Sequence, residues 1–145
     1  MGYLLAIMQF GILVLLAVWA VRQDFASLTQ ATPVVLLAGA VVMGVWTVTV
    51  NRPGNFNITP DPKPGSELVT AGPYRWIRHP MYTSVLLFAL ACVTVIGHPL
   101  AWIAWVILLA VLWGKARMEE QYLLDTHEAY QTYMVGKRRF IPWIL

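Results

Sequence analysis

Four long apolar runs divide the sequence, at residues 3–21, 33–50, 81–96 and 100–113. Only Gln9 interrupts the first run, and the turn Gly97-His98-Pro99 separates the last two. A helix needs about 20 apolar residues to span a bilayer, and each of the last two runs is slightly shorter. The pattern predicts an all-α, polytopic membrane protein with about four transmembrane helices.

The fourth helix is expected to continue beyond its apolar run. No proline follows Trp113, and Lys115 and Glu119 are neighbours on one helical face. Asp125, with Glu128 three residues later, resembles a capping box and predicts a new short helix.

That short helix is expected to end near Gly136. Tyr130, Tyr133 and Met134 fall on one of its faces, which either lies on the membrane or closes over a site. Residues 137–143 then read as a basic, aromatic tail at the membrane interface.

A polar link covers residues 22–31, and the longest segment without a helical pattern covers residues 51–71. Prolines and glycines in the longer segment favour extended or turn backbone. Its last part, from Ser66 to Thr70, is more apolar and more prone to β structure. We therefore expect this part to be ordered beside the polar stretch that follows.

Composition supports a membrane protein. The chain has 145 residues, of which 59% are hydrophobic and 12% charged, which is too apolar for a soluble domain of this size. The net charge is +3, but the basic residues lie beside helix ends, as membrane headgroups require, and no nucleic-acid motif is visible. The single cysteine, Cys92, reads as a small packing residue.

The basic residues also predict an orientation. With four spans, both termini and the segment before His79 share one side of the membrane, and the opposite side carries only Arg22. The shared side carries Arg52, Lys63, Arg75, Arg78, Lys115, Arg117, Lys137, Arg138 and Arg139. The positive-inside rule then predicts that both termini, the short C-terminal helix and the polar stretch are cytoplasmic.

Residues 72–82, GPYRWIRHPMY, carry the most concentrated polar chemistry. Pro80 suits the first position of a helix, and His79 before it reads as the cap. The free amides of the first turn lie beside Arg75 and Arg78, an arrangement that favours binding of a carboxylate or phosphate.

The aromatic residues of this stretch leave two interpretations open. Tyr74, Trp76 and Tyr82 offer flat faces for an adenine ring or a sulfonium cation. Arg, Trp and Tyr are also the usual anchors of a transmembrane helix at the membrane surface.

Combined with later residues, this stretch resembles the isoprenylcysteine carboxyl methyltransferase family, whose wider group includes phospholipid methyltransferases. The resemblance runs from near Ser66 to Pro142, about half of the chain. Its motifs are Leu68 to Tyr82 (LVTAGPYRWIRHPMY), Glu119-Glu120-Gln121-Tyr122-Leu123, Tyr130, Tyr133 and Arg139-Phe140-Ile141-Pro142.

The resemblance implies a membrane enzyme that transfers a methyl group from S-adenosylmethionine to a lipophilic acceptor, releasing S-adenosylhomocysteine. The acceptor would be a carboxylate, thiol or amine, isoprenylcysteine-like or lipid-like, that enters from the bilayer. Residues 1–145 would form one domain, with its cofactor site built from residues 66–82 and 115–142. The implied cofactor-binding residues are Ser66, Glu67, Leu68, Val69, Tyr74, His79, Pro80, Met81, Tyr82 and Glu119.

The implied catalytic residues are Lys115, Arg117 and Glu120. The family has an arginine four residues before Glu119 that orients the acceptor, and this chain has Lys115 there. Lysine keeps the charge but loses the bidentate fork, so Arg117 is expected to share the task. Glu120 is the candidate general base for an amine acceptor.

Two other classes of function stay open. Membrane sterol reductases resemble this family in their carboxyl-terminal half and bind NADPH instead. A non-enzymatic scaffold would use its basic face to hold anionic lipids. Gly39 and Gly44 in the second run permit close helix contacts, but the sequence fixes no oligomeric state.

Overall fold

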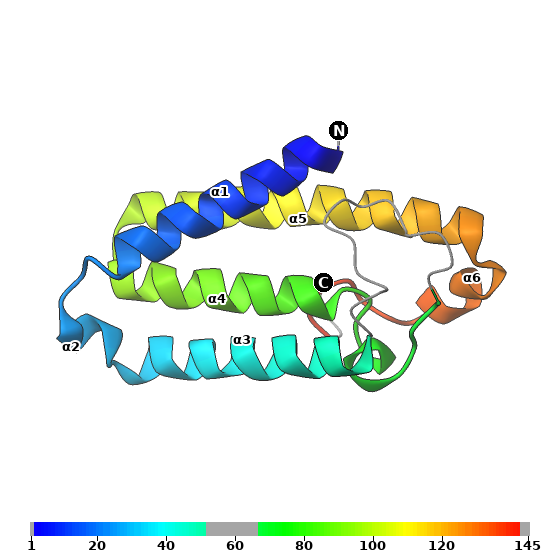
Figure 1. Ribbon diagram of the computed structural model, residues 1–145, viewed down its shortest axis with the longest axis horizontal. Coiled ribbons are helices and arrows are strands. Elements are labelled where there is room, and N and C mark those ends of the chain that lie inside the picture. Colours follow the sequence, from blue (N-terminus) through cyan, green and yellow to red (C-terminus); the bar gives the residue numbers. More distant parts are fainter. Residues whose placement is uncertain (1, 52–66, 143–145) are drawn as a thin grey trace.

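A computed structural model describes residues 2–51 and 67–142 of the chain. Its elements are α1 (Gly2–Ala20), α2 (Phe25–Leu28), α3 (Ala31–Val50), the 3₁₀ helix η2 (Gly72–Arg75), α4 (Pro80–Ile96), α5 (Pro99–Thr126) and α6 (Glu128–Met134). In Figure 1, α3, α4 and α5 lie side by side, and α1 crosses α5 at an angle. The short helix α2 lies within the predicted polar link.

The protein is an all-α polytopic membrane protein. Within the described residues, α1, α3 and α5 are long and apolar enough to cross a membrane, and α4 is a shorter apolar helix of 17 residues. Most side chains of α1 and α3 face outward and are apolar, as lipid contact requires. The core therefore lies along α4, which packs against α1, α3 and α5.

The boundaries of α4 follow the sequence prediction. Pro80 is its first residue and His79 its N-cap, although the His79 side chain makes no capping hydrogen bond. Gly97 ends the helix with a φ of 64°, a left-handed conformation that glycine adopts without a steric penalty. α5 then begins at Pro99, where His98 Nδ1 accepts a hydrogen bond of 3.2 Å from the Leu100 amide.

The predicted continuation of the fourth helix is confirmed, but the predicted capping box is wrong. α5 runs for 28 residues without a break, so it is not short, and Asp125 lies inside it. The α6 N-cap is His127, with extended backbone at φ −130° and ψ 102° and no side-chain capping bond. Asp125 cannot cap because its backbone is already helical, and the His127 amide still donates to Leu123 O at 2.9 Å.

The C-terminal segment folds back onto the residues before α4. Ile77 and Arg138 form an isolated parallel bridge, in which the Arg78 amide donates to Arg138 O at 2.8 Å. Phe140 is fully buried, and its carbonyl accepts a 2.7 Å bond from Thr83 Oγ1. Backbone hydrogen bonds and a buried ring therefore fix this segment in the fold, and its place at the membrane interface stays a prediction.

Gly72 fixes the approach of η2 to α3. Its φ is +57°, and a Cβ there would lie 2.7 Å from Val50 Cγ2 and 3.1 Å from Trp46 Nε1. Only glycine satisfies both the left-handed backbone and this close contact.

We predict that Gly72→Ala destabilises the protein much more than Gly136→Ala. Both glycines have positive φ, so both variants incur a backbone penalty of about 1–2 kcal/mol. At Gly136 nothing lies within 4 Å of the added methyl group, whereas at Gly72 overpacking adds about 1–3 kcal/mol. Thermal unfolding in detergent measures the difference, and equal melting temperatures would contradict the close contact.

Candidate active site

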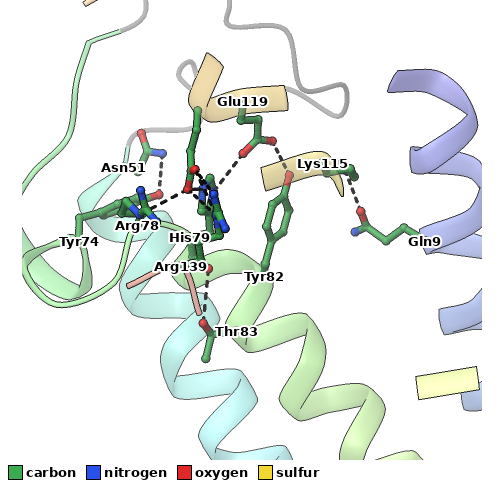
Figure 2. Close-up of polar contacts among 11 residues, drawn as sticks. Gln9, Asn51, Tyr74, Arg78, His79, Tyr82, Thr83, Lys115, Glu119 and Arg139 are labelled. Carbon is green, nitrogen blue, oxygen red and sulfur yellow. Dashed lines mark hydrogen bonds and ion pairs between the residues drawn. The ribbon is translucent and has the colours of Figure 1, made fainter. Parts of the chain in front are cut away.

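The predicted site residues lie at the end of the bundle where α4 begins and α5 passes beside it. His79 precedes α4, Tyr82 lies in its first turn, and Lys115, Glu119 and Glu120 belong to the second half of α5. Figure 2 shows these elements converging, with Arg78, His79 and Arg139 gathered where each contacts the Glu120 carboxylate. The expected meeting of the polar stretch with the end of its hairpin partner is thus present in the structure.

Glu120 is buried at the centre of this cluster. Arg139 Nη2 donates to Glu120 Oε2 at 2.8 Å, and Arg139 Nε lies 3.0 Å from Oε1 and 3.1 Å from Oε2. Arg78 Nε lies 3.4 Å from Glu120 Oε1, and His79 Nε2 lies 3.1 Å from the same oxygen. Because cations contact both oxygens, the geometry favours a structural role for Glu120 over the expected general base.

His79 bridges the two glutamates. Its Nδ1 lies 3.2 Å from Glu119 Oε2, and its Nε2 faces Glu120. Burial lowers the pKa of His79, but the hydrogen bonds and charges of the two carboxylates raise it more, so the net pKa is raised. An imidazolium donates from both nitrogens, so the two carboxylates that face the ring favour the protonated form of His79.

Glu119 is the accessible carboxylate of the pair. Its side chain is 24% exposed, compared with 6% for Glu120. The Tyr82 hydroxyl donates a hydrogen bond to Glu119 Oε1, and His79 approaches Oε2. The Tyr82 ring stacks on His79 with 5.4 Å between centroids, so internal packing occupies this ring and its hydroxyl holds Glu119 in place.

Lys115 is buried one turn before Glu119. Its ammonium donates to Gln9 Oε1 at 2.7 Å and lies 5.3 Å from the centroid of the Tyr82 ring. Figure 2 shows Gln9 reaching from α1 to this ammonium. Lys115 therefore joins α1 to the cluster.

Tyr74 anchors η2 on the other side of the cluster. Its hydroxyl accepts a 3.0 Å hydrogen bond from Asn51 Nδ2, and its carbonyl accepts a 2.8 Å bond from Tyr133 Oη. Burial raises the pKa of Tyr74 to about 12, which keeps the phenol neutral. Asn51 Oδ1 is buried and, in the part of the chain that the structure describes, accepts no hydrogen bond.

The remaining expected residues lie before η2 and in the first turn of α4. Pro80 and Met81 form the first turn of α4, Leu68 and Val69 are half-buried before η2, and Glu67 is exposed. Ser66 lies outside the described residues.

Arg117 is exposed on α5 and makes no hydrogen bond or ion pair with the cluster within residues 2–51 and 67–142. Two residues along a helix turn a side chain by about 200°, so Arg117 points away when Lys115 points inward. The geometry does not support a shared task for these two cations.

The expected anion site before α4 is filled by the chain itself. Arg78 and His79 contact Glu120, whereas Arg75 is exposed. The same cluster includes Arg139. This residue belongs to one of the motifs shared with the family, but the sequence indicated no role for it.

Gln9 and Asn51 were also missed as site residues. The sequence did indicate a contact for Gln9, because an isolated amide in an apolar run often forms a hydrogen bond with a neighbouring helix. Nothing local distinguished Asn51, whose contact with Tyr74 joins residues 23 positions apart.

Comparison with protein-family models matches residues 31–125 to the isoprenylcysteine carboxyl methyltransferase family. A search of the curated proteins found no match. The matched residues include α3, η2, α4 and most of α5, and they exclude α1, α6 and the C-terminal segment that carries Arg139. The match covers well over half of the chain and includes His79, Glu119 and Glu120. The chain therefore belongs to the isoprenylcysteine carboxyl methyltransferase family, a family of membrane methyltransferases.

Proposed function

We propose that this protein transfers a methyl group from S-adenosylmethionine to a lipophilic acceptor at the membrane surface. The observation that carries the proposal is the meeting of His79, Tyr82 and the accessible Glu119 at one end of an apolar bundle. When bound, S-adenosylmethionine supplies a methyl carbon that its sulfonium already activates for displacement. The protein then has mainly to align donor and acceptor and to exclude water, which contributes about 7–11 kcal/mol in favourable cases.

The hydrogen-bond acceptors present fit a cationic nucleoside. Glu119 only accepts hydrogen bonds, which suits ribose hydroxyls or an amino group, and its charge favours a nearby cation. Tyr82 and His79 hold this carboxylate in one orientation before any ligand arrives. Asn51 Oδ1 adds a buried acceptor without a partner among the described residues, next to the Tyr74 ring.

The surroundings of Glu120 favour an acceptor that needs no general base. An amine must lose a proton to be methylated, and the carboxylate proposed for that task is held by Arg78, His79 and Arg139. A carboxylate or thiolate acceptor arrives deprotonated. The Lys115 ammonium beside Tyr82 suits such an anionic acceptor, whose hydrocarbon part would enter from the bilayer.

The distribution of charge supports a cytoplasmic site. Four arginines belong to segments at one end of the bundle in Figure 1. Arg75 is in η2 and Arg78 follows it, Arg117 is in the second half of α5, and Arg139 is in the C-terminal segment. Arg22 follows α1 at the other end. The positive-inside rule therefore favours a cytoplasmic location for the site and for both termini.

S-adenosylhomocysteine binding tests the proposal directly. We expect the purified protein to bind this product and Glu119→Gln to weaken binding about 10–100-fold, because hydrogen bonds to a charged group are lost. Glu128→Gln, which removes an exposed carboxylate of α6, is the matched control and should keep wild-type affinity. Isothermal titration calorimetry in detergent measures both. Binding of NADPH in place of S-adenosylhomocysteine would exclude the proposed function.

The charge of His79 predicts a pH dependence of stability. Its pKa is raised in the folded protein, so its contribution is complete below the ordinary pKa of about 6.5 and is lost as the pH rises through the raised value. The melting temperature of the wild type should therefore decrease as the pH rises through the raised pKa of His79. His79→Gln should remove most of this decrease. His98→Gln, at the far end of α4, is the control and should show the same decrease in melting temperature as the wild type. Parallel pH curves for wild type and His79→Gln would show that His79 is not the titrating group.

A further inference from the structure

Gln9 is the only side chain of α1 that carries an amide, and no residue of this helix carries a formal charge. It is buried in a helix whose other side chains are almost all apolar and mostly face outward. It also lies before the residues matched to the family, which begin at residue 31. Gln9 therefore contributes a contact to the site from outside residues 31–125, which match the family.

The contact with Lys115 orients a cation without cancelling its charge. Gln9 Oε1 is 2.7 Å from Lys115 Nζ, and both residues are buried, at 5% and 3% exposure. A neutral amide oxygen satisfies one ammonium hydrogen and leaves the positive charge in place. A carboxylate would compensate a buried ammonium more fully, so the amide favours a role that needs the charge.

The charges of the cluster support this interpretation. The cationic side chains are Arg78, His79, Lys115 and Arg139, and the anionic ones are Glu119 and Glu120. Three of these cations contact Glu120, whereas Lys115 lies on the Tyr82 side, near the accessible Glu119. Among the described residues of this cluster, the cations outnumber the carboxylates, so an anionic group beside Lys115 would be attracted.

We propose that Gln9 is a positioning residue that holds the Lys115 ammonium toward the anionic group of the methyl acceptor. The inference rests on the proposed function and adds α1 to the acceptor side of the site. Gln9 acts through Lys115 and does not itself need to touch the acceptor.

The test uses the full chain in detergent with N-acetyl-S-farnesylcysteine, a prenylated carboxylate, as the acceptor probe and its methyl ester as the neutral counterpart. We expect Gln9→Leu to raise the KM or Kd for the probe about tenfold, with S-adenosylhomocysteine affinity within about twofold of wild type. Lys115→Met should have at least this effect, and the double variant should be no worse than Lys115→Met alone, because the two residues act as one unit.

Two further variants separate positioning from packing. Gln9→Glu would neutralise Lys115, so positioning predicts weaker probe binding, whereas a purely structural role predicts that the new ion pair preserves it. Leu16→Ala removes a buried apolar contact of α1 and should lower the melting temperature without a selective loss of probe binding.

The outcomes distinguish this inference from the proposed function. If wild type fails to bind S-adenosylhomocysteine, the proposed function falls. If it binds S-adenosylhomocysteine but does not prefer the carboxylate probe to its methyl ester, only the inference on Gln9 is overturned. The inference is equally overturned if Gln9→Glu keeps wild-type probe affinity, or if Gln9→Leu lowers stability, cofactor affinity and probe affinity together as a packing defect would.

Discussion

The buried charge of Glu120 is the constraint on which the rest of the site depends. Three cations from two separate segments contact it, Arg78 and His79 before α4 and Arg139 near the C-terminus. Removing one partner of such a buried network typically costs about 3–5 kcal/mol, because a charge is left without compensation. The network therefore fixes the start of α4, the second half of α5 and the returning C-terminal segment relative to one another.

Glu119 and Glu120 are adjacent and chemically identical, yet the fold gives them different environments. Neighbouring residues of a helix point about 100° apart, so one carboxylate faces the buried cations and the other faces a partly exposed space. His79 contacts both because each ring nitrogen reaches one of them. The buried carboxylate thereby positions the histidine, and the histidine and Tyr82 position the accessible carboxylate.

The bundle is suited to lipid and the site to polar ligands. α1 and α3 direct apolar side chains outward, as a bilayer requires, whereas ion pairs and aromatic contacts gather where α4 begins. This arrangement puts a polar reaction site beside the route by which a lipophilic acceptor would arrive. Gln9 extends the polar site along α1, since its amide is the one strongly polar group that this helix contributes.

The sequence by itself determined the features that depend on local physics. Apolar run lengths predicted the long helices, Pro80 predicted where α4 begins, and the absence of a breaker after Trp113 predicted that α5 continues beyond its apolar run. Tertiary structure decided that Glu120 contacts Arg139, 19 residues away, and that Lys115 contacts Gln9, 106 residues away. Such pairings depend on how helices pack, and no local propensity encodes them. The wrong capping box has a different reason, since the continuous helix through Asp125 competes with its local capping tendency and prevails.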